Sequence, residues 1–111
     1  MMKRSLGPMS TLTKERARIV SISDSTPPRQ SVLVVLSSVG VRAYWNMCQH
    51  VPTPLGDETT ELISEDAIVC RSHGARYTLE NGVCFLGPCR GKWLEPVDIE
   101  IIGDEIFAQN I

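Results

Sequence analysis

Short apolar segments recur along the chain at even spacing. The first three are ARIVSIS (17–23), SVLVVLSS (31–38) and VRAYWN (41–46), each rich in β-branched or aromatic residues. A polar stretch with two prolines separates the first two segments, and a Val-Gly break separates the second from the third. Such residues favour an extended backbone, so the pattern predicts three strands.

Five more segments of the same kind follow in the second half of the chain: AIVC (67–70), RYTL (76–79), VCFL (83–86), VDIEII (97–102) and EIFAQ (105–109). Asn81-Gly82 predicts a hairpin with a two-residue turn in which both turn positions have positive φ. Gly103-Asp104 predicts a second hairpin. Because there is almost no helical pattern, the sequence predicts an all-β fold, an antiparallel β-sandwich or barrel.

The length of 111 residues predicts one domain with a single core. We place this domain at 17–111 and treat 1–16 as an N-terminal extension, whose flexibility the sequence leaves open. The longest apolar run, 32–36, is far too short to cross a bilayer. The basic N-terminus has no apolar stretch behind it and so does not resemble a secretory signal. We therefore expect a cytoplasmic protein, in which four cysteines are thiols or metal ligands rather than a disulfide framework.

The formal net charge of −2 argues against nucleic acid as the partner. Acidic side chains concentrate at 57–66, and this run is either a solvated loop or the rim of a docking site. The second candidate for a docking rim is a basic set formed by Arg71, Arg76, Arg90 and Lys92.

The chain has only two histidines, and each follows a cysteine closely. Cys48 and His50 come just after a predicted strand, as do Cys70 and His73. Two loops could thus bring two thiols and two imidazoles to one metal centre. Packed residues, a zinc site and a [2Fe–2S] centre are the alternatives. Structural zinc sites usually have a Cys pair followed by a His pair, whereas a [2Fe–2S] centre with Cys on one iron and His on the other matches the mixed order.

Cys-x-His, nineteen residues and Cys-x-x-His together resemble the ligand motif of the Rieske [2Fe–2S] proteins, especially the small Rieske-type ferredoxins. HGARY (73–77) resembles the family's His-Gly-x-x-aromatic run, and GVCFLGPCRGKWLEPVDIEI (82–101) resembles its Gly-Pro loop and closing strands. The resemblance covers residues 17–109. It implies a Rieske-like antiparallel β-sandwich or barrel with a small cluster-binding subdomain formed by loops. It also implies a [2Fe–2S] cluster whose inner iron binds Cys48 and Cys70 and whose outer iron binds His50 and His73.

The chain departs from the Rieske subunits of cytochrome complexes near the cluster. Their extra disulfide cysteines correspond to Thr53 and Ser72, so that disulfide is expected to be absent. Their serine that donates to a bridging sulfide corresponds to Ala75. Their aromatic hydroxyl is kept as Tyr77, which is either a donor to a cluster-side thiolate or a core residue.

Four other residues are expected to be structural. Cys84 and Cys89 could pair across a turn, but in the cytoplasm we expect free thiols, with Cys89 shielding the cluster from the Gly-Pro loop. Trp45 and Trp93 are expected to be core anchors, because large rings bury much apolar area.

The resemblance implies a one-electron carrier that passes electrons from a reductase to an oxygenase or another redox acceptor. One alternative is a small Rieske redox subunit of a larger oxidoreductase, of the nitrite reductase or arsenite oxidase type. Another is a zinc-stabilised interaction module. No residues suggest a catalytic apparatus, so we expect an electron-transfer component whose partners are redox proteins. The sequence does not define the oligomeric state.

Overall fold

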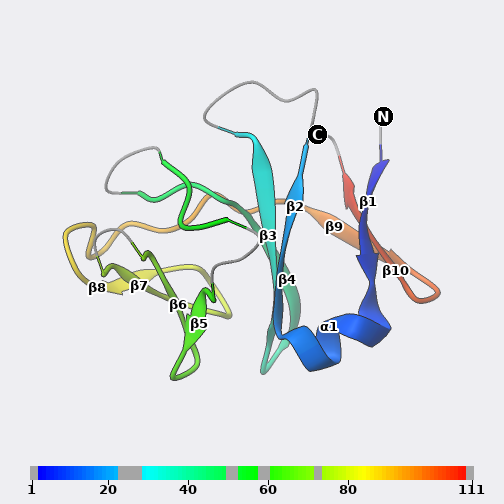
Figure 1. The fold of residues 1–111 in the computed structure, drawn as a ribbon, viewed down its shortest axis with the longest axis horizontal. Coiled ribbons are helices and arrows are strands. Elements are labelled where there is room, and N and C mark those ends of the chain that lie inside the picture. The colour runs from blue at the N-terminus through cyan, green and yellow to red at the C-terminus, as the bar shows by residue number, and fades with distance from the viewer. Residues whose placement is uncertain (1–2, 23–28, 50–52, 58–60, 72–73, 110–111) are drawn as a thin grey trace.

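The computed structural model describes residues 3–22, 29–49, 53–57, 61–71 and 74–109. In this part of the chain the strands form three antiparallel sheets (Figure 1). The first sheet has the order β1 (Lys3–Pro8), β10 (Glu105–Gln109), β9 (Ile99–Ile102). The second consists of β2 (Ala17–Ser21), β3 (Ser31–Ser37) and β4 (Gly40–Trp45). The third consists of β5 (Ile63–Ser64), β6 (Ala67–Val69), β7 (Arg76–Thr78) and β8 (Cys84–Leu86). The predicted all-β antiparallel fold is confirmed.

The strand β3 is buried on both faces and connects two hydrophobic cores. Successive strand residues point to opposite faces of a sheet. Val32 and Val34 accordingly pack in one core with residues of β1, α1 (Met9–Glu15) and β10. Leu33 and Val35 pack in the other core with residues of β6, β7 and β8. The second sheet is therefore the middle layer (Figure 1), which explains why its central strand is an unbroken apolar run.

Both predicted hairpins are present, but the turn of the first differs from its prediction. Gly103-Asp104 is a two-residue turn, because Ile102 pairs with Glu105. The Asn81-Gly82 hairpin joins β7 to β8, yet its turn is longer, since the N–H of Thr78 donates to the carbonyl of Val83 at 2.9 Å. Of its two predicted turn residues only Gly82 has positive φ, at 67°. The two-residue prediction for this turn was wrong.

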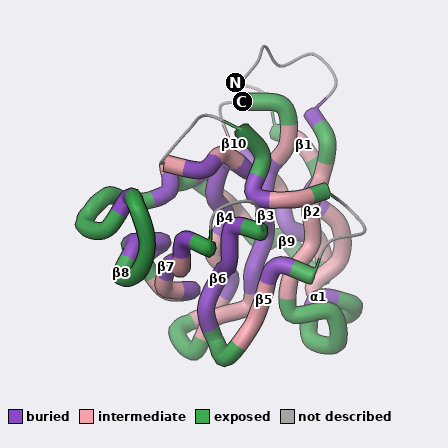
Figure 2. Tube along the Cα trace, turned by 60° about the vertical axis from the view of Figure 1, so that its left-hand side comes forward, coloured by how far each residue is buried: buried purple, intermediate pink, exposed green. Residues whose placement is uncertain are grey.

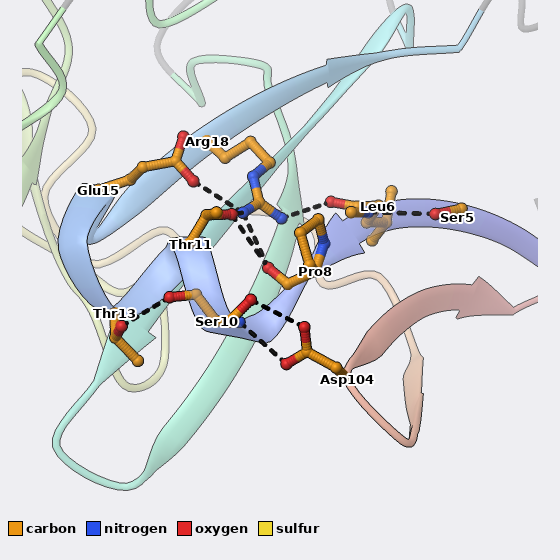
Figure 3. Close-up of polar contacts among 10 residues, drawn as sticks. Ser5, Leu6, Pro8, Ser10, Thr11, Thr13, Glu15, Arg18 and Asp104 are labelled. Carbon is orange, nitrogen blue, oxygen red and sulfur yellow. Dashed lines mark hydrogen bonds and ion pairs between the residues drawn. The ribbon is translucent and has the colours of Figure 1, made fainter.

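The segment assigned from the sequence to an N-terminal extension forms part of the fold. β1 pairs with β10 along its length, and α1 follows it directly. Asp104, in the β9–β10 turn, accepts hydrogen bonds from the N–H and the hydroxyl of Ser10, at 3.0 and 2.8 Å (Figure 3). The sequence pattern did not predict β1 or α1, because the apolar residues that they bury, Leu6 and Leu12, are isolated among polar neighbours.

Arg18, on β2, holds β1 and α1 in place through hydrogen bonds. Its side chain is largely buried, and its guanidinium donates to four acceptors (Figure 3): Leu6 O at 2.8 Å, Pro8 O at 2.9 Å, Thr11 Oγ1 at 2.6 Å and Glu15 Oε1 at 2.7 Å. Its hydrogen bond to Glu15 lowers the pKa of that carboxyl.

None of the helices in the described part of the chain has the length and hydrophobicity that a membrane span requires.

Candidate metal centre

Two loops beside the third sheet carry the buried cysteines of the predicted ligand set. Cys48 comes three residues after β4, and Cys70 comes directly after β6. Their exposed fractions are 2% and 0%, and both belong to the same hydrophobic core. The N–H of Arg71 donates to the carbonyl of Leu55 at 3.3 Å, so the two loops are in direct contact.

The two loops are closed in the same way. The N–H of Cys48 donates to the carbonyl of Thr53, and the N–H of Cys70 donates to the carbonyl of Ala75, both at 2.8 Å. Each closed segment spans a cysteine and, by sequence, the histidine that follows it. His50 and His73 themselves lie outside the described residues. The structure thus brings the loops of the two Cys/His pairs together.

Asn46 anchors the first loop to the middle sheet. It is the end residue of the apolar stretch that forms β4, and it is only 3% exposed. Its Nδ2 donates to Ser31 Oγ at 3.0 Å and to the carbonyl of Gly56 at 2.9 Å. Its Oδ1 accepts from the N–H of Leu55 at 2.9 Å. The sequence analysis missed this residue; the available signal was a lone amide next to the first cysteine loop.

Tyr77, on β7, points its hydroxyl at the first cysteine loop. The hydroxyl lies 3.5 Å from Cys48 Sγ and 3.0 Å from Cys89 Sγ, and it accepts a hydrogen bond of 3.1 Å from the N–H of Gln49. The ring is fully buried, and this burial raises the pKa of Tyr77. The hydroxyl therefore keeps its proton and has one hydrogen to donate to a sulfur.

The loop after β8 covers the second cysteine loop. Gly87 has φ +104°, and a Cβ built there would lie 2.8 Å from Cα of Ala75. Only glycine permits this approach without displacing the backbone. Cys89, two residues further on, is 1% exposed, in agreement with a shielding role. Pro88 separates these two residues, so the Gly-Pro loop recognised in the sequence lies where the resemblance predicts.

The cysteines of this region form a chain of sulfur contacts. Cys84 donates to the carbonyl of Leu86 at 3.3 Å, and Cys89 donates to Cys84 Sγ at 3.1 Å. Burial, followed by the hydrogen bond from Cys89, raises the pKa of Cys84 to about 11. All four cysteines lie in the described part of the chain, and none is in a disulfide. Cys84 and Cys89 are thus not bridged to each other, as expected from the sequence.

The two tryptophans differ. Trp45 is 7% exposed and belongs to the core, as predicted. Trp93 is 61% exposed, so its prediction as a core anchor was wrong. Its backbone pairs with Val83 in an isolated bridge at the outer edge of the third sheet, where no layer covers the ring among the described residues.

Over its described residues, the protein is thus a small β-protein with three sheets. The middle sheet lies between a sheet formed by the N- and C-terminal strands and a small sheet beside two loops with buried cysteines. Comparison with protein families identifies it further. Residues 7–103 match the Rieske [2Fe-2S] domain, so the chain belongs to this family. Rieske domains bind a [2Fe–2S] cluster. No curated protein sequence matches the chain.

Solved structures share this fold at low sequence identity. The ferredoxin of carbazole 1,9a-dioxygenase from Nocardioides aromaticivorans IC177 is 20% identical, with a TM-score of 0.72 and coverage of 97% of each chain. The plasma membrane Rieske protein PetC3 from Synechocystis PCC 6803 is 19% identical, with a TM-score of 0.73 and coverage of 96% of this chain and 99% of that one. A chain in the complex of reduced oxygenase and oxidized ferredoxin in carbazole 1,9a-dioxygenase is 18% identical, with a TM-score of 0.74 and coverage of 96% and 91%.

Proposed function

We propose that the protein is a one-electron carrier whose [2Fe–2S] cluster is held by Cys48, Cys70, His50 and His73. The observation that carries this proposal is the pair of matching loops in a Rieske domain, each closed from its cysteine to the carbonyl five residues later. Thiolates suit iron–sulfur clusters, and imidazole is the second ligand type of a Rieske centre. The cluster would supply the electron exchange, and the chain would supply its burial and its hydrogen bonds.

The residues around the cysteines fit such a cluster. Cys48 and Cys70 are buried, and the Tyr77 hydroxyl lies within reach of Cys48 Sγ. A protonated hydroxyl beside a thiolate ligand stabilises the negative charge that reduction adds. Ala75 is buried and has no hydroxyl to add a second donor. Of these two residues, Tyr77 is thus the one whose side chain can tune the cluster.

Docking is proposed to use an exposed apolar patch on the third sheet, the β8 patch, which consists of Val83, Phe85, Leu86 and Trp93. Their exposed fractions are 37, 45, 52 and 61%. β8 is an edge strand, and its outer end and the loop after it are exposed (Figure 2). A β-bridge brings Val83 and Trp93 side by side. Exposed apolar side chains that lie together mark interaction sites, and tryptophan is frequent among the energetically dominant residues.

The charge around the β8 patch favours the basic docking rim over the acidic one. Arg90 and Lys92 are exposed, and residues 81–94 contain no Asp or Glu. In the acidic run, Asp66 forms an ion pair with Arg16, Nη2 to Oδ1 at 2.6 Å. Opposite charges around an apolar contact guide association. The proposed partner is therefore a redox protein with an apolar surface bordered by carboxylates.

An oxygenase is the acceptor that we propose, with a reductase as the donor, in the cytoplasm. Support comes from the carbazole 1,9a-dioxygenase complexes, in which a ferredoxin is bound to an oxygenase. The alternative of a redox subunit within a larger oxidoreductase predicts a stable complex. Gel filtration of a native extract separates the two, because a carrier elutes as a small protein and a subunit elutes with its assembly.

Metal analysis tests the ligand proposal. We expect two irons and two acid-labile sulfides per chain, and the reduced protein should give the electron paramagnetic resonance signal of a mixed Cys/His cluster. His50→Cys should still assemble some cluster but lower its potential, because a thiolate adds negative charge at the outer iron. Zinc in place of iron rejects the proposal, and an unchanged potential in the variant removes His50 from the ligand set.

The docking proposal has its own test. Trp93→Ala should lower the second-order rate of electron transfer with the reductase and oxygenase of the same host, while Val39→Ala should not. Val39 is a matched control, since it is also 61% exposed but lies in the β3–β4 turn. The rate should also fall as salt rises, because charges are screened over about 8 Å at physiological ionic strength. Equal rates for the two variants exclude the β8 patch.

A further inference from the structure

The thiol pair Cys84/Cys89 has no part in the proposed ligand set, yet the fold holds its two sulfurs in contact. Cys84 begins β8, and the chain returns to it after the cover loop: the N–H of Cys84 donates to the carbonyl of Lys92 at 2.7 Å, and the N–H of Gly91 donates to the carbonyl of Cys84 at 2.9 Å. Cys89 lies in the loop so closed, and its sulfur is 3.1 Å from that of Cys84. The contact is a consequence of the backbone pairing and not of side-chain flexibility alone.

A disulfide between these residues requires only a small movement. Its sulfurs must approach from 3.1 Å to about 2.05 Å, a shift of about 1 Å. The cover loop can absorb such a shift beside Cys89 at Gly91, which is exposed, has a left-handed φ of +92° and has nothing within 4 Å of a Cβ built there. Both cysteines are 1% exposed, so only a small oxidant can reach their sulfurs without opening the loop.

We propose that Cys84 and Cys89 are a modification site: hydrogen peroxide oxidises the pair to an intramolecular disulfide. Peroxide first oxidises one thiol to a sulfenic acid and releases water. The second sulfur then displaces the sulfenic hydroxyl, which leaves as a second water. Two S–H bonds are lost, one S–S bond forms, and the two electrons and two protons of the pair reduce one peroxide to two waters. A dithiol reductant reverses the reaction by thiol–disulfide exchange.

The disulfide would also change the surroundings of Tyr77. Cys89 Sγ lies 3.0 Å from the Tyr77 hydroxyl, which has a single hydrogen for two sulfurs, and Cys48 Sγ lies 3.5 Å away on the other side. Oxidation makes the Cys89 sulfur a poorer acceptor and leaves Cys48 as the better one. The oxidised pair should therefore raise the potential of the cluster. This second step rests on the proposed function, whereas disulfide formation itself does not.

The test uses the full chain with its metal, in which iron and sulfide are first measured. The protein is treated with hydrogen peroxide, freed of peroxide with catalase, denatured and alkylated. Chymotrypsin then cuts after Phe85 and Leu86, between the two cysteines. We expect a Cys84–Cys89 linked peptide pair that is two hydrogens lighter than the sum of its parts and that a phosphine separates. In Cys84→Ser the link should be absent.

Each result decides one of the two proposals. Complete alkylation of both cysteines after peroxide, a sulfinic acid at either one, or links to Cys48 or Cys70 overturns the modification site. If the protein is colourless and still forms the link, the cluster proposal is rejected and the modification site stands. If the protein is red-brown and forms no link, the modification site is rejected and the cluster proposal stands. The midpoint potential should rise after oxidation in the wild type and stay constant in Cys84→Ser; equal behaviour of the two refutes the coupling through Tyr77.

Discussion

Replacing Gly87 by alanine tests whether the cover loop is fixed against the second cysteine loop. The new methyl group would be placed 2.8 Å from Cα of Ala75, a backbone atom that cannot rotate away. Such overpacking costs about 1–3 kcal/mol. A left-handed φ of +104° costs a non-glycine residue about 1–3 kcal/mol more. Gly87→Ala should thus lower the free energy of unfolding by about 2–6 kcal/mol, out of a total of about 5–15 kcal/mol for a typical domain.

Gly91→Ala is the matched control for this substitution. Gly91 lies in the same exposed loop with φ +92°, but nothing lies within 4 Å of a Cβ built there. It shares the backbone strain and lacks the contact with Ala75. Thermal unfolding of both variants, at equal iron content, should give a melting temperature lower for Gly87→Ala by at least about 4 °C, since each kcal/mol shifts a domain of this size by about 4 °C. Equal melting temperatures would refute the close packing of the two loops.

Two further substitutions test the first cysteine loop. Asn46→Ala should destabilise the protein by about 1–3 kcal/mol, because the buried N–H of Leu55 loses its acceptor. Asn46→Asp keeps that acceptor but places an oxygen where Nδ2 donated to the carbonyl of Gly56, so it should also be less stable than the wild type. Denaturant unfolding curves measure both variants, and wild-type stability in either one contradicts the assignment. Tyr77→Phe should lower the cluster potential by no more than about 130 mV, since a hydrogen bond to a charged group contributes about 1.5–3 kcal/mol and 59 mV corresponds to a tenfold change for one electron. Voltammetry of the two proteins decides this, and an unchanged potential means that the hydroxyl serves Cys89 rather than Cys48.

The sequence predicted the strands with strong apolar patterns but missed those held by distant contacts. β3 was clear because burial on two faces requires an unbroken apolar run, and β4 was clear from its β-branched and aromatic residues. β5 was missed because two residues, Ile63 and Ser64, have no recognisable pattern. Its hairpin turn, Glu65-Asp66, has positive φ at both residues but lacks the glycine that usually marks such a turn in a sequence. The acidic run, predicted as a solvated loop or a docking rim, thus contains a turn, and its Leu62 packs in the same core as the cysteines.

The parts of the candidate site that follow from the Cys/His motif could be predicted from the sequence. The contacts that depend on how distant segments pack could not. The two cysteine loops followed from spacing, and the structure brings them together. The contact of Cys89 with both Cys84 and Tyr77 could not be foreseen, because it depends on how the cover loop folds back. The exposure of Trp93 was missed for a similar reason: an aromatic residue in a β-rich sequence suggests a core position, and only the edge position of β8 shows otherwise.

The contacts that hold the two cysteine loops in place suit a site for electron transfer. The first is tied to the middle sheet through Asn46 and Ser31, the second is covered at Ala75 by Gly87, and the two are joined to each other. These supports come from segments far apart in sequence, so Cys48 and Cys70 cannot be displaced without disturbing the folded core. A carrier gains from this arrangement, because its ligands must keep nearly the same positions when the cluster is oxidised and when it is reduced. The exposed β8 patch lies on the same small sheet, so a docked partner would meet a surface that is already fixed relative to the cysteines.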